Sequence, residues 1–210
     1  MFNSRHKLLI FDFDGTLGDS KEFYRKQIFL NLKKYRYKIN KKKFNENFGL
    51  RLDRMLRVLH IHKHAKQITK SINDYAFENA GKIKATPGIS VLRLLRKKYK
   101  LALVSNSRKK FIVKCLKNLR VYDNFDYVLG GDEIISKVKA FKHLFKILRI
   151  KPVEAIYIAD RAGDVVVAKQ SKCDMISVSN RYSWSPLSEI KKATPDKIIN
   201  NLNQLEKILL

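Results

Sequence analysis

The stretch LLIFDFDGTLGDS, Leu8 to Ser20, decides the fold and opens the candidate site. Its four leading apolar residues are followed at once by Asp12 and Asp14, and then by Gly15 and Thr16. An apolar run of strand length that ends in acids and a glycine indicates a buried strand carrying carboxylates at its C-terminal tip. Open α/β sheets keep their chemistry at that edge. We therefore expect Asp12 to be a nucleophile that the remaining chain positions.

The bulk composition is that of an ordinary globular protein. The chain has 210 residues, 45% of them apolar, which is enough for one core and a small second module. Cys115 and Cys173 match no metal spacing, and two lone thiols suit a reducing compartment. No run approaches the roughly 18 apolar residues of a membrane span. The basic N-terminus MFNSRHK leads into a stretch broken by acids, so we expect a cytoplasmic protein without a signal peptide.

The charge is the unusual property. Lys and Arg number 45 against 19 Asp and Glu, a net charge of +26. Such an excess can bind polyanions by releasing counterions from phosphates. The basic residues are scattered through almost every expected helix, which favours solvated helix faces over a dedicated binding stripe. The segment KKYRYK, Lys33 to Lys38, still leaves a nucleic-acid partner open.

Strand patterns recur after the first one and alternate with helical patterns. They are LALVSNS (101–107), FDYVLGG (125–131), AIYIAD (155–160) and DMISVS (174–179). The resulting order βαβαβαβαβ predicts an α/β fold, a Rossmann-like parallel sheet of about five strands with helices on both faces.

Residues 21–84 contain helical patterns only. Ser20 can cap the first of these helices, and Thr86-Pro87-Gly88 marks the return to alternating elements. We expect an inserted all-helical cap domain over residues 20–84. The core would then comprise residues 1–19 and 85–210.

Polar side chains follow the apolar strands where a parallel sheet would gather them. They are Asp12 and Asp14, Ser105, Lys137 before a helix, and Asp160 with Asp164. Clustered carboxylates suit Mg²⁺, which prefers oxygen ligands. A cation, an ammonium and a hydroxyl together would hold a phosphoryl group and offset its negative charge.

These residues suggest a division of chemical roles. Asp12 would attack phosphorus and form an aspartyl-phosphate. Asp14 would protonate the leaving alkoxide and then activate water, while Thr16 orients both groups. Singly, each residue has a simpler interpretation: the acids and Ser105 could cap helices, and Lys137 is one lysine among many. Their conjunction in this order favours a site.

With these motifs the chain resembles the haloacid dehalogenase-like (HAD) superfamily over essentially its whole length. DFDGTL is similar to the DxDxT signature, LVSNS to the second motif, SKVKAFKHLFKIL to the third and IYIADRAGD to the fourth. The resemblance implies that Asp12 is nucleophile and metal ligand, and that Asp14 is the acid/base and binds metal through its carbonyl.

The same resemblance implies the remaining site residues. Lys137 is assigned to catalysis, and the metal shell is completed by Asp160 with Asp164. The phosphate-binding residues would be Gly15, Thr16, Ser105 and Asn106.

The helical insertion resembles the cap of the phosphoglycolate phosphatase-like branch. Within it FGLRLDRML is similar to that branch's specificity loop, which makes Gly49 and Arg51 candidates for substrate contact. A solvated arginine at a helix start is the competing interpretation of Arg51.

Two departures from the family pattern are visible. Ala159 stands where glycine is usual, and its methyl group is tolerable if φ is negative there. Lys139 lies two residues beyond Lys137 and competes for the role of active-site lysine. The spacing to Pro152 and the fourth strand favours Lys137.

The leading hypothesis is a Mg²⁺-dependent phosphatase for a small phosphorylated metabolite, with phosphoglycolate as the default. A dehalogenase would not need Asp14, whereas a phosphomutase shares both aspartates and stays open. The charge suggests a different class, a nucleic-acid-binding protein or polynucleotide phosphatase. The intact acids and lysine argue against a catalytically idle interaction module.

Overall fold

The computed structural model describes residues 5–210. The first four residues, part of the basic N-terminal stretch and of the expected core segment 1–19, lie outside the described residues. The strands are β1 Leu8–Phe11, β2 Gly18–Asp19, β3 Lys84–Ala85, β4 Lys100–Val104, β5 Tyr127–Leu129, β6 Ala155–Ala159, β7 Asp174–Val178 and β8 Lys197–Ile199. The α-helices are α1 Lys21–Lys34, α2 Lys41–Asn47, α3 Leu52–Val58, α4 Ala65–Glu78, α5 Val91–Leu95, α6 Lys109–Asn118, α7 Lys137–Leu148, α8 Ala162–Ser171, α9 Leu187–Ala193 and α10 Gln204–Leu209. Short 3₁₀ helices cover Ala80–Lys82, Tyr122–Asn124 and Pro152–Glu154.

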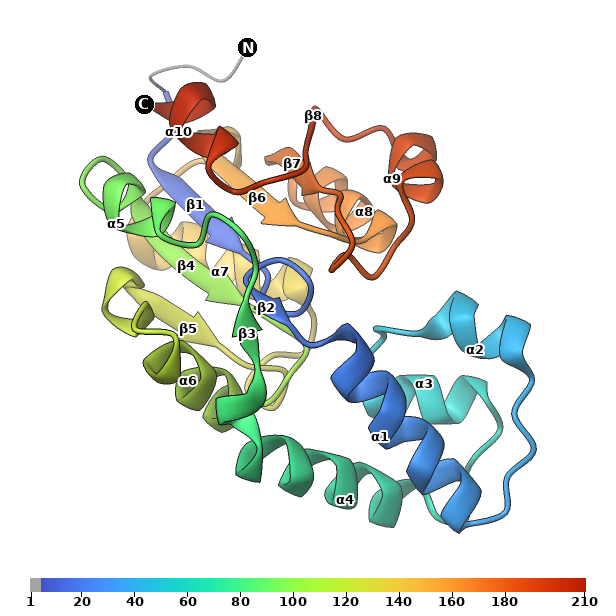
Figure 1. Cartoon of the computed structure of the whole chain (residues 1–210). Helices are drawn as coiled ribbons and strands as arrows, with labels where there is room; N and C mark the ends of the chain where they lie inside the picture. Colours follow the sequence, from blue (N-terminus) through green and yellow to red (C-terminus); the bar gives the residue numbers. More distant parts are fainter. Residues whose placement is uncertain (1–4) are drawn as a thin grey trace.

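One parallel sheet organises the core, with strand order β5-β4-β1-β6-β7-β8 (Figure 1). β1 lies inside the sheet, where Leu9 is opposite Leu101 of β4 and Ile156 of β6. All ladders of this sheet are parallel. The C-terminal ends of β1, β4 and β6 therefore meet at one edge, and the expected Rossmann-like α/β class is confirmed.

The sheet has six strands where about five were expected. The addition is β8, which pairs with β7 at the sheet edge, and α9 precedes it. β8 has three residues, of which only Ile199 is buried. A strand this short at an edge shows no apolar run or alternation that a sequence pattern could reveal.

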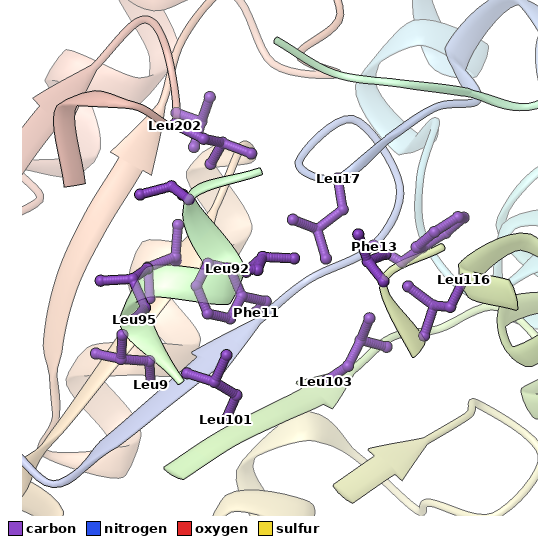
Figure 2. Packing of buried hydrophobic residues seen from close by; sticks show 14 of the residues in the cluster. Leu9, Phe11, Phe13, Leu17, Leu92, Leu95, Leu101, Leu103, Leu116 and Leu202 are labelled. Carbon is purple, nitrogen blue, oxygen red and sulfur yellow. The ribbon is translucent and has the colours of Figure 1, made fainter. Parts of the chain in front are cut away.

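Alternate residues of β1 pack against helices on opposite faces of the sheet. Leu9 and Phe11 belong to a buried cluster with residues of α5, α6 and α10. Figure 2 shows Leu9 and Phe11 close to Leu92 and Leu95 of α5. Leu8 and Ile10 belong to a second cluster with α7 and α8. Fully burying such a side chain is worth about 1.5–3 kcal/mol. The strand that carries the acids is thus held rigidly from both sides.

Helices α1–α4 lie together beside the sheet and have a buried cluster of their own (Figure 1). The chain enters and leaves them through a two-stranded antiparallel ribbon, in which Gly18 pairs with Ala85. We propose on this basis that residues 20–84 form a cap on a core made of 1–19 and 85–210.

Two helices of the cap end in tighter turns. α1 ends at Lys34, and Arg36 then adopts a left-handed φ of 57° that cannot continue the helix. α4 ends at Glu78, and the chain continues in a 3₁₀ turn before Ile83.

Candidate active site

The turn after β1 folds tightly back on itself. The N–H groups of Leu17 and Gly18 both donate to the Phe13 carbonyl at 2.9 Å. Gly15 has a φ of +78°, and a Cβ at this position would lie 2.3 Å from Oδ2 of Asp160. Any other residue would be strained in its backbone and would also displace that carboxylate.

Three hydroxyl groups hold the Asp14 carboxylate. Ser20 Oγ donates to Oδ1 at 2.6 Å, while Ser107 Oγ and Ser105 Oγ donate to Oδ2 at 2.6 and 3.3 Å. Burial raises the pKa of Asp14, and the hydrogen bonds from the serines oppose that rise. Ser20 was expected to cap α1, but its side chain makes no capping hydrogen bond and binds Asp14 instead.

Lys137 lies between two carboxylates. It is the first residue of α7, which is capped by Ser136. Its ammonium is 3.1 Å from Asp12 Oδ1 and donates to Asp164 Oδ1 at 2.9 Å. It also donates to the Tyr157 hydroxyl at 2.7 Å, which in turn donates to Asp164 Oδ1 at 2.8 Å. This arrangement is a buried network of charged and polar groups centred on the ammonium.

The pKa values of the groups in this network are shifted in different directions. Burial raises the pKa of Asp12 to about 7, against the opposing charge of Lys137. Burial alone would lower the pKa of Lys137, but the carboxylates of Asp12 and Asp164 outweigh it and raise that pKa. Burial likewise works to raise the pKa of Asp164, yet the Lys137 charge and its hydrogen bond help to lower it. Lys137 and Asp164 therefore form a charged pair, and full ionisation of Asp12 calls for additional positive charge.

Asp160, at the end of β6, is held by two donors. Thr16 Oγ1 donates to its Oδ1 at 3.1 Å, and the main-chain N–H of Trp184 donates to its Oδ2 at 2.6 Å. Burial raises the pKa of Asp160 well above its usual value. Like Asp12, Asp160 therefore needs additional positive charge nearby to be fully ionised.

The three acids fit a bound Mg²⁺. Ligand atoms of Asp12, Asp160 and Asp164 all lie within 4.8 Å of one another. Within residues 5–210, Asp164 Oδ2 is buried and accepts no hydrogen bond, and the buried Asp12 Oδ1 has only its ion pair with Lys137. Buried carboxylate oxygens without donors are the ligands that a hard divalent cation takes. The Asp14 carboxylate faces the serines instead. The expected contact between the main-chain carbonyl of Asp14 and the metal stays a prediction.

A cavity of about 70 Å³ lies beside these acids, between the core and α1–α4. Of the residues singled out from the sequence, those that line it are Asp12, Asp14, Gly49, Arg51, Ser105, Asn106 and Lys137. Gly15 and Thr16 lie against Asp160, and their expected contact with phosphate stays a prediction. Arg51 donates to the Ile134 carbonyl at 3.1 Å and pairs with Asp53.

Lys139 is exposed, whereas Lys137 is only 7% exposed and sits at the cavity. Burial and position at the cavity thus favour Lys137 over Lys139. Ala159 is fully buried in β6 and is not among the residues with positive φ, so its methyl group is accommodated.

Several residues at the site were not recognised in the sequence. They are Ser107, Tyr157, Arg161 and Trp184, together with Ser20 in its observed role. Two carried a usable signal. Ser107 follows Ser105 by two positions in LVSNS, and Tyr157 is the one residue of AIYIA with a polar group, inside an otherwise apolar strand.

Fold and site define an α/β protein with a Rossmann-like parallel sheet, whose acids gather at the C-terminal edge of the strands. A family model described as haloacid dehalogenase-like hydrolase matches residues 9–178, and the chain belongs to this family. A phosphoglycolate phosphatase of Psychrobacter arcticus is 28% identical over 97% of this chain and 96% of its own length. Family and relatives together identify the chain as a HAD-like phosphatase.

Solved structures agree in fold. A predicted phosphatase from Clostridium acetobutylicum has a TM-score of 0.81 at 26% identity, covering 97% of this chain and 98% of that one. A haloacid dehalogenase-like family protein from Streptococcus pneumoniae has a TM-score of 0.85 at 17% identity, covering 99% and 100%. Within residues 5–210, no helix has the length and apolar character needed to cross a membrane.

Proposed function

We propose that this protein is a Mg²⁺-dependent phosphatase that hydrolyses a small phosphorylated metabolite through an aspartyl-phosphate on Asp12. Phosphoglycolate or a similar small ester is the default substrate. The observation that carries the proposal is the buried arrangement of Asp12 beside the Lys137 ammonium at 3.1 Å, with the serine-held Asp14 at the same cavity.

In the first step a carboxylate oxygen of Asp12 attacks phosphorus, and the bond to the ester oxygen breaks. The leaving alkoxide takes a proton from Asp14, whose pKa is raised by burial and which can therefore carry that proton. In the second step Asp14 accepts a proton from water as the water attacks phosphorus, which releases phosphate and restores Asp12.

The remaining residues offset the charge of the phosphoryl group. Lys137 and the hydroxyl of Ser105 line the cavity with Asn106 and would hold its oxygens. Asp12, Asp160 and Asp164 would hold Mg²⁺, which supplies positive charge next to the phosphoryl oxygens when it is bound. Gly15 and Thr16, besides their expected contact with phosphate, would position Asp160.

Purified protein should hydrolyse acetyl phosphate or an aryl phosphate in the presence of Mg²⁺ and should lose this activity with a chelator. A panel of substrates measured side by side then separates the candidates: phosphoglycolate, sugar phosphates and a 5′-phosphorylated oligonucleotide. Preference for the oligonucleotide, with steep salt dependence, would support a polynucleotide phosphatase. Transfer of phosphate between carbons without release of inorganic phosphate would indicate a phosphomutase. Hydrolysis that persists with the chelator would contradict the metal-dependent mechanism.

Mg²⁺ alone should raise the melting temperature, because a ligand that binds only the folded state stabilises it by about 2.7 kcal/mol at a hundred times its Kd. Asp160→Asn should weaken this stabilisation, since it removes one of the three clustered carboxylates. Asp74→Asn is the matched control, because Asp74 lies on α4 and pairs with Lys70 at the surface. Differential scanning fluorimetry over a Mg²⁺ series measures the effect. Equal Mg²⁺ shifts in the Asp160→Asn and Asp74→Asn variants would show that the cluster is not the metal site.

A further inference from the structure

Trp184 and Arg161 of the core both contact the dipeptide Phe48-Gly49 of the cap. The Trp184 ring stacks on Phe48 with centroids 4.5 Å apart and planes 8° from parallel. Arg161 donates to the Gly49 carbonyl at 2.5 Å. Gly49 has a φ of +91°, and a Cβ there would lie 2.7 Å from both Arg161 and Trp184. The absence of a side chain at Gly49 is what lets the cap come this close to the core.

The same core residues are linked to the acidic cluster. The main-chain N–H of Trp184 donates to Asp160 Oδ2 at 2.6 Å, and Arg161 follows Asp160 directly in the chain. The Trp184 ring also packs against the hydrophobic cluster of the cap. The position of the cap at Phe48 and the position of the Asp160 carboxylate are therefore both tied to Trp184.

Trp184 carries a polar group that the protein leaves unused. Its indole Nε1–H is buried and finds no acceptor among the described residues, although the side chain lines the cavity. In this structure the cap lies against the core through Phe48 and Gly49, an arrangement that we call closed. A buried donor without an acceptor disfavours this closed arrangement. A ligand oxygen that accepted this hydrogen bond would favour closure, which is the differential interaction that a ligand-driven shift requires.

We propose that Trp184 couples closure of the cap to the placement of Asp160 and that its indole N–H binds an oxygen of the phosphorylated substrate. The inference rests on the proposed phosphatase function, whose substrate would occupy the same cavity. Through its ring stack on Phe48, Trp184 moves with the cap. The hydrogen bond from the main chain fixes the carboxylate, and the indole N–H makes closure depend on the ligand.

Fluorescence offers a readout that is independent of turnover, because Trp184 is the only tryptophan in the chain. Mg²⁺ together with inorganic phosphate should change the emission of the wild-type protein. Phe48→Ala should shift the emission to the red, since it exposes the indole, and should abolish the response to Mg²⁺ and phosphate. Unchanged emission and an intact response in Phe48→Ala would overturn the coupling.

Kinetics separate the two functions assigned to Trp184. Trp184→Phe keeps a ring against Phe48 but loses the N–H, so KM should rise about tenfold with a smaller change in kcat. Phe48→Ala and Trp184→Ala should also lower kcat and raise the Mg²⁺ concentration for half-maximal activity. Phe77→Leu, at an aromatic residue of α4 that contacts Lys110 and Lys114 outside the site, is the control.

The outcomes separate this inference from the proposed function. If the wild type is active and the variants at Trp184 and Phe48 match Phe77→Leu in kcat, KM and Mg²⁺ dependence, the inference is wrong and the phosphatase stands. If the wild type is inactive on every phosphate ester, the phosphatase proposal fails. In that case an emission change with Mg²⁺ and phosphate that is lost in Phe48→Ala supports the coupling, and an unresponsive wild type refutes it.

Discussion

Asp12→Asn should lower phosphatase turnover by about four orders of magnitude or more while leaving the protein folded. The amide cannot form the acyl phosphate, although it has nearly the size of the carboxyl group. Folding should tolerate the change, because burial raises the pKa of Asp12 to about 7 and its charged form is costly in the metal-free protein. Lys137 keeps its pairing with Asp164. Phosphate release measures the loss, and thermal unfolding confirms the fold.

Asp14→Asn is the matched comparison for this variant. It keeps the nucleophile and removes the group that protonates the leaving oxygen. Its turnover of an alkyl phosphate should fall, yet acetyl phosphate, whose leaving acetate needs no proton, should still phosphorylate Asp12. Acid quenching and mass spectrometry of the peptide that contains position 12 would show phosphate in the Asp14→Asn variant and none in the Asp12→Asn variant. Equal labelling of the two would place the nucleophile elsewhere.

The sequence predicted those site residues that lie next to recognisable strand patterns. Asp12, Ser105 and Asp160 each end an apolar run, and parallel strands bring such ends to one edge. Lys137 was predicted because it opens a helix at the expected spacing to Pro152 and the fourth strand. In each case a local sequence pattern predicted the strand or helix, and the topology of a parallel sheet predicted that the residues at its ends lie close together.

Residues that reach the site from irregular segments escaped prediction. Trp184 contacts Asp160 because the 180–183 turn is closed by a hydrogen bond from the Asn180 N–H to Ser183 Oγ, and that hydroxyl donates to the Val178 carbonyl. No apolar period marks such a turn. Ser20 shows a related difficulty. A serine before a helix predicts a cap, and only the tertiary structure reveals that Asp14 competes for its hydroxyl.

Lys137→Met should destabilise the protein by about 3–5 kcal/mol, because it leaves buried carboxylates without their cation. The Lys137 side chain is 6% exposed, and its ammonium lies within 3.1 Å of both Asp12 and Asp164. Activity should fall with stability, since the ammonium would also hold the phosphoryl group. Lys139→Met is the control, because Lys139 is exposed two residues further along α7. Urea unfolding of the metal-free proteins gives the difference.

The pH dependence of this loss tests its electrostatic origin. Without the ammonium, burial would hold the pKa values of Asp12 and Asp164 above their unfolded values of about 4. Carboxyl groups with raised folded pKa values stabilise the fold at low pH, and that stability is lost as pH rises through the folded pKa. In the wild type the pKa of Asp164 is lowered, despite burial, chiefly by the Lys137 charge, so its contribution is present above the unfolded pKa and lost in acid. The raised pKa values in the variant make the destabilisation larger at about pH 8 than at about pH 5, whereas the lost Asp164 contribution is nearly constant over that range and fades only below the unfolded pKa.

A double variant separates lost charge pairing from lost packing. Lys137→Met with Asp164→Asn removes one of the stranded carboxylates, so it should recover part of the stability that Lys137→Met loses near neutral pH. Tyr157 then keeps an acceptor, since its hydroxyl can donate to the amide oxygen at position 164 as it does to Asp164 Oδ1. If the double variant were as unstable as the sum of the single ones, or if the loss did not vary with pH, Lys137 would act through packing of its methylene chain rather than through its charge.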